Sequence, residues 1–514
     1  MAEASTNAVA WPASVGAGRV ALRDSSMLAR LVWPALALVA GIAAVAPLWS
    51  STLLPFQDAP EHVAAIRVLA DFHTAGFGFE RWFQIDLARL QYLAFYLPAA
   101  FLSHWVGPQA ACRLVLSLIA LALPLSVWML LGAFGRDRRL AVLAPVVFHS
   151  QTTYLGFFNF VESVPAAIAV VALFERELRS PKWTRAVVLA VLSSVLLWLH
   201  PSAVAFALGA AGVLALTSGQ SRRRIGRAAV PLLPSVGLFV MWAAQALAHR
   251  DGPGVSAHSA PEWLGWKLQT LDLLRFGNVL AGHADELFWA ALVGLWLMAV
   301  WVPGRPRPPR AWRLPLLAGL AFVGYFALPY QVGFMGYIHL RALPFLVLLA
   351  LAAPCLAPGR RTSVLLAAAV LLQVGYAVVL SRVYRAFDDE AQVTQLETVL
   401  HAAAPGARLV GLIWNQESKL VQFKSYLHFA QYYEVERGGR ARVNFADAPW
   451  TPVRYRPGTE PPALPFGWEE APGRFDPARD GAEADYLLVR GGPAPTGPFV
   501  LESAAGSWAL YQRR

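Results

Sequence analysis

Residues 31–49 read LVWPALALVAGIAAVAPLW, an apolar run of 19 residues, and PFQDAPEH follows shortly after it at residues 55–62. A helix needs roughly 20 apolar residues to cross a bilayer. Pro47 directly follows Ala44-Val45-Ala46 and disfavours signal-peptidase cleavage there, so we expect a retained first membrane helix. The acidic motif at residues 55–62 should then lie just outside the membrane.

The composition of the whole chain supports a membrane protein. Of its 514 residues, 57% are apolar and 15% are charged, whereas soluble globular proteins carry about 25% charged residues. This balance excludes a disordered chain, a coiled coil and a set of soluble domains. The two cysteines, Cys112 and Cys355, lie in separate apolar runs, which excludes a disulfide scaffold. We expect a polytopic membrane protein.

Eleven apolar runs fit an all-α membrane domain of about 11 spans. A twelfth run, Leu90–Val106, contains Gln91, Pro98 and His104, and we interpret it as a juxtamembrane or re-entrant helix. The eleven predicted spans are Leu31–Trp49, Ala111–Phe134, Leu140–Phe148, Phe160–Phe174, Ala186–Leu199, Ser202–Leu216, Ala228–Ala248, Leu287–Val302, Leu314–Leu328, Ala342–Leu356 and Val364–Leu380.

Charge sets the predicted orientation. The net charge of +11 is concentrated in five short linkers that together hold 17 basic residues and three acids. Cytoplasmic loops of membrane proteins carry such an excess, which accounts for the charge without nucleic acid as a partner. The linkers are Gly135–Arg139, Glu175–Arg185, Ser221–Arg227, Pro303–Arg313 and Gly359–Arg361.

This orientation divides the chain into three parts. Residues 1–30 form a cytoplasmic N-terminal tail, and residues 31–381 form the transmembrane domain with its first outer loop at 50–110. Residues 382–514 form a small soluble α/β domain outside the cytoplasm. Within that domain we expect a helix at Tyr384–Ala404 and strands at Arg408–Ile413, Tyr486–Arg490 and Phe499–Leu501. The Ala-, Arg- and Pro-rich composition suggests a bacterial protein, hence the bacterial inner membrane.

The motif at residues 55–62 is the strongest candidate for chemistry. Asp58, Glu61 and His62 are spaced so that a helix beginning near Pro60 would place Asp58 and His62 in one pocket. A carboxylate beside an imidazole can act as base and orienter, or as two metal ligands. The alternative is that Asp58 only caps an amphipathic surface helix that runs to about Phe72.

The loop after Phe148 contains further candidates for substrate binding. Tyr154, Asn159 and Glu162 lie among aromatic residues that could line a sugar-sized cavity or form an interfacial belt. Glu162 is ionisable at membrane depth, which marks a candidate site. His200, at a helix break, is either a ligand or a solvated turn residue.

Residues 337–341, YIHLR, place His339 and Arg341 at the outer start of a span. An arginine there needs an anionic partner, and its guanidinium binds phosphate at two points. The alternative is that Arg341 snorkels to the lipid headgroups. In the tail, the aromatic run Tyr426–Tyr433 could bind carbohydrate, pack on the membrane or belong to a core.

Several motifs are absent from the sequence. It contains no Walker loop, Rossmann fingerprint, GxSxG, HExxH or CxxC motif. The cytoplasmic loops are also too short for a nucleotide site. We therefore expect no cofactor; a divalent metal is compatible with the acidic motif but is not supported by a ligand motif.

Taken together, these features resemble the integral-membrane C-type (GT-C) glycosyltransferases. The resemblance rests on the first span Leu31–Trp49, the acidic motif Asp58-Ala59-Pro60-Glu61-His62, the helix Leu90–Val106, the span Ala111–Phe134 and the tail Arg382–Arg514. The family commonly has two adjacent acids in its first loop, whereas this chain has Gln57-Asp58 and then Glu61.

The resemblance implies transfer of a hexose or pentose from a polyprenyl-phosphate donor to an extracytoplasmic acceptor, with inversion. The acceptor would be a cell-envelope glycan, a lipid or a protein. Asp58 would be the catalytic base and Arg341 would hold the leaving phosphate. His62 would orient Asp58 or contact the phosphate, and Glu61, Tyr154, Asn159, Glu162, His200 and His339 would complete the substrate site.

Two other functions fit the sequence. A transporter or flippase for a lipid-linked or polar solute would explain the spans and the ionisable residues at membrane depth, but it predicts inverted repeats that we do not find. A non-catalytic scaffold of an envelope assembly complex would keep the same architecture. The separation of Asp58 and Arg341 distinguishes the enzyme from both, because one sugar phosphate must reach both residues.

Overall fold

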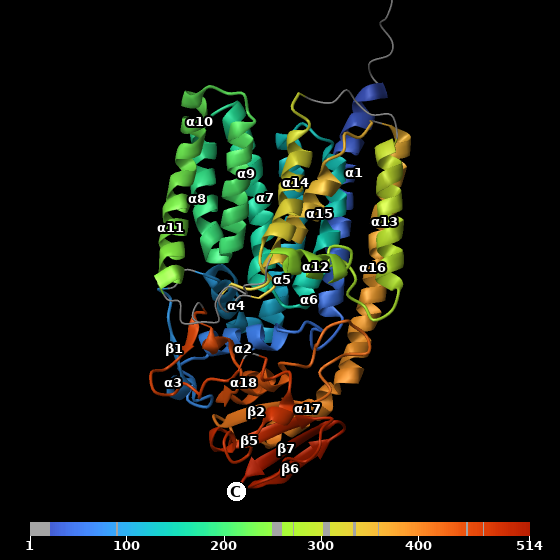
Figure 1. The fold of residues 1–514 in the computed structure, drawn as a ribbon. Coiled ribbons are helices and arrows are strands. Elements are labelled where there is room, and N and C mark those ends of the chain that lie inside the picture. Colours follow the sequence, from blue (N-terminus) through green and yellow to red (C-terminus); the bar gives the residue numbers. More distant parts are fainter. Residues whose placement is uncertain are drawn as a thin grey trace, which may run out of the picture.

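The computed structural model describes residues 21–88, 91–248, 260–270, 272–301, 309–332, 336–357, 359–448, 451–465 and 467–514. Long helices lie side by side in a bundle, and a smaller α/β domain covers one end of it (Figure 1). Residues 1–20 of the predicted N-terminal tail lie outside the described residues. Helix α1 (Ala21–Val45) already begins within that tail.

Six segments are long and apolar enough to cross a membrane. They are α1 with the following 3₁₀ turn η1 (Ala46–Trp49), α5 (Pro108–Ala133), α7 (Phe158–Arg179), α10 (Arg222–Ala229) continuing through η3 (Val230–Leu232) into α11 (Leu233–Ala248), α13 (Ala284–Trp301), and α16 (Arg360–Ala391) with α17 (Val393–Ala402).

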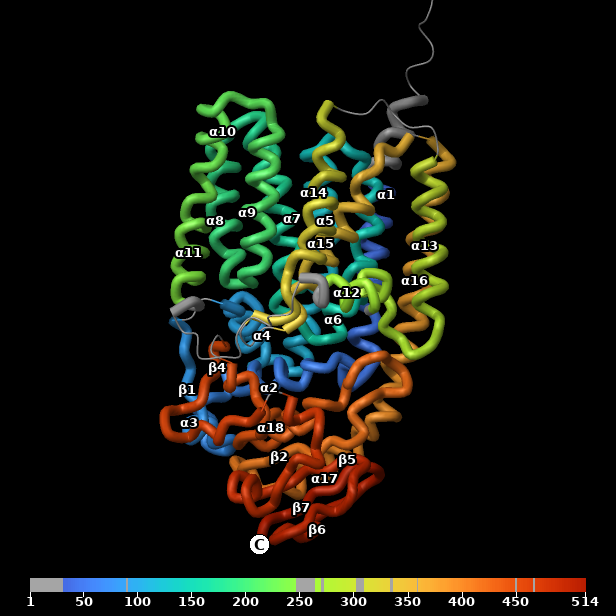
Figure 2. Tube along the Cα trace, viewed as in Figure 1, coloured from blue at the N-terminus to red at the C-terminus, as the bar shows by residue number. Residues whose placement is uncertain are grey.

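Five shorter apolar helices complete the bundle, so the fold is a multi-pass membrane fold, although the count of about 11 spans is not confirmed. They are α4 (Leu93–Val106), α8 (Trp183–Leu199), α9 (Pro201–Leu216), α14 (Arg313–Ala327) and α15 (Leu343–Ala352), which continues from the 3₁₀ segment η4 (Ile338–Ala342). Helix α12 (Ala260–Thr270) and the one-turn helix α6 (Gln151–Tyr154) lie near the covered end of the bundle (Figures 1 and 2).

The predicted span Leu140–Phe148 is not an α-helix. It lies in the buried 3₁₀ segment η2 (Arg138–Val147), which contains Pro145 and is entirely buried from Leu140 onward. A 3₁₀ helix rises about 2.0 Å per residue, so ten residues fall short of the roughly 30 Å hydrocarbon core. Apolarity and length alone did not separate this inner segment from a membrane helix.

The first outer loop folds against the covered end of the bundle. Helix α2 (Ala59–Ala70) begins with Pro60 in its first turn, as the motif predicted, and is followed by α3 (Phe79–Trp82) and strand β1 (Phe83–Ile85). Proline is favoured at this position because its fixed φ suits a helix start and its missing N–H is not needed there. Most of α2 is buried, so the helix belongs to the interior and not to an exposed amphipathic surface.

The C-terminal domain is built on a five-stranded sheet in the order β3-β2-β5-β7-β6. Strand β2 pairs in parallel with both β3 and β5, whereas β7 pairs antiparallel with β5 and β6. These strands are β2 (Arg408–Ile413), β3 (Arg440–Ala441), β5 (Tyr486–Arg490), β6 (Phe499–Ala505) and β7 (Trp508–Arg513). The predicted strands at 408–413 and 486–490 coincide with β2 and β5.

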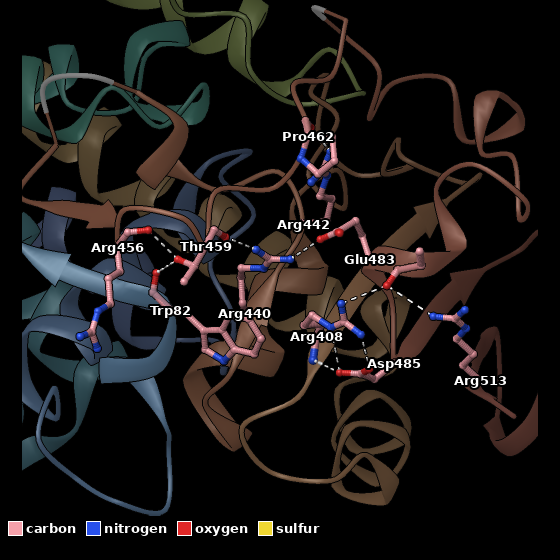
Figure 3. A network of polar contacts seen from close by, with 11 residues as sticks. Trp82, Arg408, Arg440, Arg442, Arg456, Thr459, Pro462, Glu483, Asp485 and Arg513 are labelled. Atoms are coloured by element: carbon pink, nitrogen blue, oxygen red, sulfur yellow. Dashed lines mark hydrogen bonds and ion pairs between the residues drawn. The ribbon is translucent and has the colours of Figure 1, made fainter.

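The first outer loop and the C-terminal domain form one layer. Strand β1 pairs antiparallel with β4 (Val453–Tyr455). Close to this pairing, the side chain of Arg440 donates to Glu483 at 2.8 Å, and Thr459 donates to the carbonyl of Trp82 at 2.8 Å (Figure 3). The guanidinium of Arg440 lies 5.0 Å from the Trp82 ring. These contacts fix the C-terminal domain on the loop that carries α2.

Short connections in the C-terminal domain bring its α18 (Tyr432–Arg437) and the preceding 3₁₀ turn η5 (Phe429–Gln431) onto α2. Figures 1 and 2 show the two chain segments adjacent at the boundary between the bundle and the domain. Ser425 donates its hydroxyl to the carbonyl of Pro55 at 3.0 Å. The residues just before Asp58 are therefore held by the tail, about 370 residues away in the sequence.

Candidate active site

Asp58 is placed by a close contact between two loops. Gln57 donates its backbone N–H to the carbonyl of Tyr154 at 2.8 Å. Gly156, with φ +92°, lies against Asp58, and a Cβ on Gly156 would be 2.5 Å from the Asp58 Cβ. Only glycine tolerates both this backbone conformation and this approach. Asp58 precedes α2, but its side chain makes no capping hydrogen bond, so the capping alternative is wrong and the carboxylate is available for other contacts.

The carboxylate of Asp58 faces a histidine from the C-terminal domain. Nε2 of His428 lies 3.4 Å from Oδ1 of Asp58, and Nδ1 of the same ring lies 3.4 Å from Oε1 of Glu61. The imidazole thus lies between two carboxyl groups that stand three residues apart at the start of α2. We refer to Asp58, His428 and Glu61 as the outer triad.

Glu61 is the buried end of the outer triad. Its side chain is 2% exposed, and Oε2 accepts the backbone N–H of Phe445 at 3.0 Å. Burial raises the pKa of Glu61 to about 8, against the opposing effects of His428 and the Phe445 N–H.

His428 is the cationic member. Burial alone would lower its pKa, but the contact with Asp58 and the negative charges of Asp58, Glu61 and Glu469 raise it to about 9. An imidazolium donates from both ring nitrogens, which matches the two carboxyl oxygens on opposite sides of the ring. At neutral pH the imidazolium offsets the charge of the Asp58 carboxylate.

His62 does not share a pocket with Asp58, and this corrects the prediction from spacing. Nε2 of His62 donates to the carbonyl of Gly156 at 2.7 Å, and Nδ1 accepts from the hydroxyl of Tyr96 at 2.8 Å. The ring stacks on Phe158 with centroids 4.5 Å apart. Burial lowers the pKa of His62 to about 4, so it is neutral. His62 supports the carbonyl of the glycine that touches Asp58.

Asn159 extends this support. Its side chain hydrogen-bonds the hydroxyl of Tyr96, which in turn donates to His62. Oδ1 of Asn159 is buried without a hydrogen-bond partner among the described residues. Asn159 is thus tied to the site through Tyr96 and His62, and it keeps one acceptor unused.

Arg341 is a buried cation without a carboxylate partner among the described residues. Its side chain donates from Nη1 to the carbonyl of Gly336 at 3.1 Å, and its Nε has no partner there. The guanidinium lies 5.1 Å from the Phe157 ring and 6.0 Å from the Phe160 ring. Because Arg341 is only 7% exposed, its donors point into the protein and do not reach lipid headgroups by snorkelling.

His200 lies beside Arg341. Its ring is 5.5 Å from that of Tyr92 and 5.4 Å from that of Phe160, and Phe160 also contacts Arg341. Nδ1 accepts the backbone N–H of Ser202 at 3.1 Å and so caps α9. His200 is buried, which excludes the solvated turn.

The outer triad and Arg341 are joined by a single stretch of backbone. Gly156 touches Asp58, and the next residue, Phe157, lies under the Arg341 guanidinium. Phe158 then stacks on His62. A carboxylate and a guanidinium therefore approach adjacent residues of one loop, at the end of the bundle that the C-terminal domain covers.

Three other predicted site residues lie elsewhere. Tyr154 is fully buried, and its hydroxyl accepts from Tyr384 at 2.9 Å in an aromatic core. His339 is 3.5 Å from Asp272 and lies against the rings of Trp266 and Tyr325.

Glu162, the third of these residues, lines an apolar cavity. The cavity has a volume of about 420 Å³ and lies between α4, α5, α7 and α8. Oε2 of Glu162 is buried without a hydrogen-bond partner among the described residues. Glu162 is one helical turn beyond Phe158 on α7, so this residue of the cavity wall lies close in sequence to the loop that contacts Asp58 and Arg341.

The residue that sequence reasoning missed is His428. It stands within the aromatic run Tyr426–Tyr433, which the sequence analysis assigned to carbohydrate binding or packing. No local pattern connects it with Asp58. No group of three or more His, Cys, Asp or Glu side chains among the described residues is arranged to hold a metal ion, and we derive no step through a metal.

No family model matches the chain, and no curated protein matches it. Among solved structures, it is similar to the cryo-EM structure of the arabinofuranosyltransferase AftD from mycobacteria, with a TM-score of 0.51 and 14% identity. The match covers 93% of this chain and 40% of that chain. A mutant form of the same enzyme matches with a TM-score of 0.48 and 16% identity, over 93% of this chain and 41% of that chain.

This chain spans about two fifths of the length of the structures it matches. At this level of identity the likeness concerns the fold alone. The chain therefore shares with AftD the fold of a membrane protein, over 93% of its length.

Proposed function

We propose that this protein is a membrane glycosyltransferase that transfers a sugar from a polyprenyl-phosphate donor to an acceptor outside the cytoplasm. The observation that carries the proposal is the pair of groups that approach the adjacent residues Gly156 and Phe157. Asp58 is a partly exposed carboxylate, and Arg341 is a buried guanidinium without a carboxylate partner among the described residues. The GT-C-like fold supports the same activity.

The donor would bind through its phosphate and its lipid chain. A guanidinium binds a phosphate group at two points. Within the described part of the chain, the guanidinium of Arg341 donates a hydrogen bond only to the carbonyl of Gly336. The apolar cavity beside Glu162 opens between helices whose outer faces carry exposed leucines, such as Leu118 and Leu125. An apolar chain that enters from the bilayer fits this lining.

The reaction follows from these positions. The Asp58 carboxylate takes the proton of an acceptor hydroxyl, and the oxygen attacks the anomeric carbon of the donor sugar. The bond between that carbon and the phosphate oxygen breaks, and its electron pair stays on the phosphate. Arg341 stabilises the developing negative charge. Direct displacement of this kind inverts the configuration at the anomeric carbon.

The proposed orientation places this site outside the cytoplasm of a bacterial cell, at the inner membrane. The basic segment that forms α10 lies at the end of the bundle opposite the C-terminal domain (Figure 1). The positive-inside rule would place α10 in the cytoplasm. The outer triad and the C-terminal domain then face the extracytoplasmic side, where polyprenyl-linked sugars and envelope acceptors meet.

A transfer assay tests the proposal. Purified protein in nanodiscs would be offered a panel of polyprenyl-phosphate sugars with membrane-extracted acceptors, and Asp58→Asn would be compared with wild type. Loss of a general base typically costs about 10²–10⁴-fold in rate, and we expect a loss in that range. Asp389→Asn, an exposed acid on α16, is the matched control and should retain activity.

The outcome separates the candidate functions. Equal transfer by wild type and Asp58→Asn would remove Asp58 as the base. Saturable binding of the lipid phosphate without transfer from any donor would favour the transporter or the scaffold, and movement of the bound lipid between leaflets would distinguish those two.

A further inference from the structure

We propose that His428 is a positioning residue that the C-terminal domain supplies to the membrane domain: clamped between Asp58 and Glu61, it holds the Asp58 carboxylate oriented for the acceptor. This inference rests on the proposed function for the role of Asp58. It also assigns a task to the C-terminal domain, which must be seated on the first outer loop for the site to be complete.

The first argument is the orientation of the ring. Nε2 and Nδ1 of His428 each lie 3.4 Å from a carboxyl oxygen, one on Asp58 and one on Glu61. The closest approach to Asp58 is at Oδ1, and Oδ2 accepts no hydrogen bond within the described part of the chain. One oxygen of the base is thus fixed, and the other remains for a substrate hydroxyl.

The second argument is the support behind the ring. Glu61 is held by the N–H of Phe445 at 3.0 Å. The loop that presents this N–H is pinned by Glu434, whose Oε1 accepts from the backbone of Ala441 and from the side chain of Asn444, both at 2.7 Å. Val443 in the same loop has φ +62°, a conformation that β-branched residues rarely adopt. The loop is therefore strained into the shape that fixes Glu61.

The third argument is the order of exposure. The side chains of Glu61, His428 and Asp58 are 2%, 12% and 17% exposed, respectively. Exposure to solvent thus increases from Glu61, which is held by the Phe445 N–H, through His428 to Asp58. A reacting side chain oriented by a second group, which is in turn oriented by a third, is the arrangement found in other activated sites.

The charges around His428 agree with this assignment. Acids face it from three directions: Asp58 and Glu61 from the start of α2, and Glu469 from the C-terminal domain. The neighbouring His62 is neutral and buried. An imidazolium in this position offsets the Asp58 charge, which lowers the repulsion between Asp58 and an incoming donor phosphate.

The direct test is a titration of His428 in the full-length protein in nanodiscs, by NMR of protein labelled at the histidine rings. The His428 signal is identified as the one missing from His428→Gln. In wild type we expect this ring to stay protonated to a pH of about 9, the value that its contacts produce. In Asp58→Asn, which keeps His428 in place, its pKa should fall by about one unit or more because burial is then opposed by less charge.

A wild-type His428 that is already neutral at pH 7, or one that titrates at the same pH in Asp58→Asn, would overturn the proposed positioning of Asp58 by His428. This titration requires no glycosyl transfer. If His428 titrates as expected and no donor supports transfer, the inference about His428 holds and the proposed function fails. If the titration fails while transfer depends on Asp58, the function stands and the inference about His428 is wrong.

The kinetic test uses His428→Gln, with His401→Gln as the matched control because His401 is exposed on α17. We expect His428→Gln to lower kcat on the order of 10- to 100-fold with little change in KM for the donor, and to lose the fall in rate that wild type shows as pH rises through about 9. A role in structure alone predicts the same alkaline fall at a lower rate, and that result would overturn the proposal.

Discussion

Two buried arginines at opposite ends of the bundle differ in their partners. At the end that carries the basic linkers, Arg313 is paired with Glu175 at 2.8 Å and also donates to Thr217 at 3.1 Å and to the carbonyl of Leu214 at 2.7 Å. At the end covered by the C-terminal domain, Arg341 donates to one carbonyl and contacts two aromatic rings. Both side chains are almost fully buried.

We interpret the difference as that between a structural charge, Arg313, and the charge proposed to bind the donor phosphate, Arg341. A buried cation is expensive unless it is paired and hydrogen-bonded. Arg313 meets that requirement within the protein, and its contacts there account for its burial. Arg341 does not meet it within the described residues, and a bound phosphate would supply the missing anion. The predictions below test whether the two ends really differ in this way.

The largest effect is expected at the structural end. Arg313→Met leaves the fully buried Glu175 with Arg179, at 2.7 Å, as its remaining cation. Breaking one side of a buried pair typically costs about 3–5 kcal/mol, and the contact with Arg179 should place the loss at the lower end of that range. We expect a loss of that size in the free energy of unfolding, measured by SDS titration of the purified protein. Binding of polyprenyl phosphate by the fraction that remains folded should be unchanged, and a selective loss of binding would contradict the division between the two ends.

The second largest effect is expected for Gly156→Ala, at the end of the bundle that the C-terminal domain covers. The added Cβ would lie 2.5 Å from the Cβ of Asp58, at a residue with φ +92°. Strain of this kind costs about 1–3 kcal/mol, and the contact should also displace Asp58 and reduce transfer.

Gly135→Ala is the matched control for this change. Gly135 has φ +64° with no atom within 4 Å of the added Cβ, so it reports the backbone strain alone. Equal effects of the two substitutions on transfer would show that the contact with Asp58 has no consequence.

The pH dependence of stability should reflect the ionisation of the outer triad. The pKa of His428 is raised to about 9 and that of Glu61 to about 8. Each group contributes stability that is present below its unfolded pKa and is lost as pH rises through its folded pKa. We expect the midpoint of thermal unfolding to fall as the pH rises from about pH 6 to pH 9.

Glu61→Gln separates this effect from general alkaline denaturation, because it removes the Glu61 contribution and should make the slope shallower. On the acid side, the pKa of His62 is lowered to about 4, so its contribution is present above pH 6.5 and is lost as pH falls through about 4. A midpoint that rises from pH 6 to pH 9 would contradict the assignment.

The smallest effect on stability is expected for Arg341→Met. Because Arg341 has no carboxylate partner within the described part of the chain, its removal leaves no orphaned acid. The apolar replacement should change the free energy of unfolding by about 1 kcal/mol or less, in either direction. A loss as large as that of Arg313→Met would show that Arg341 is a structural charge.

The sequence predicted those features that depend on local pattern. Apolar runs located the long helices, proline located the start of α2, and short β-branched runs located β2 and β5. It failed at Leu140–Phe148, where a buried 3₁₀ segment is as apolar as a membrane helix. Apolarity reports burial, and burial inside the protein and burial in lipid produce the same composition.

The candidate site could be predicted only in part, because residue spacing reports local neighbours and not contacts between distant parts of the chain. Spacing placed Asp58 and Glu61 near one another at the start of α2, and both face His428. Spacing also paired Asp58 with His62, but His62 instead bonds Gly156 and Tyr96. His428 comes from a distant part of the chain, so only the tertiary fold could identify it.

Binding of polyprenyl phosphate tests the central claim most directly. Wild type, Arg341→Met and Asp58→Asn would be titrated in nanodiscs with polyprenyl phosphates of several chain lengths. We expect saturable binding to wild type, a loss of about 2–3 kcal/mol in affinity for Arg341→Met, the range for a charge-assisted contact of this kind, and near-wild-type binding for Asp58→Asn. Wild-type protein that shows no saturable binding at any chain length, or Arg341→Met that binds as tightly as wild type, would contradict the assignment of a phosphate to the unpaired guanidinium.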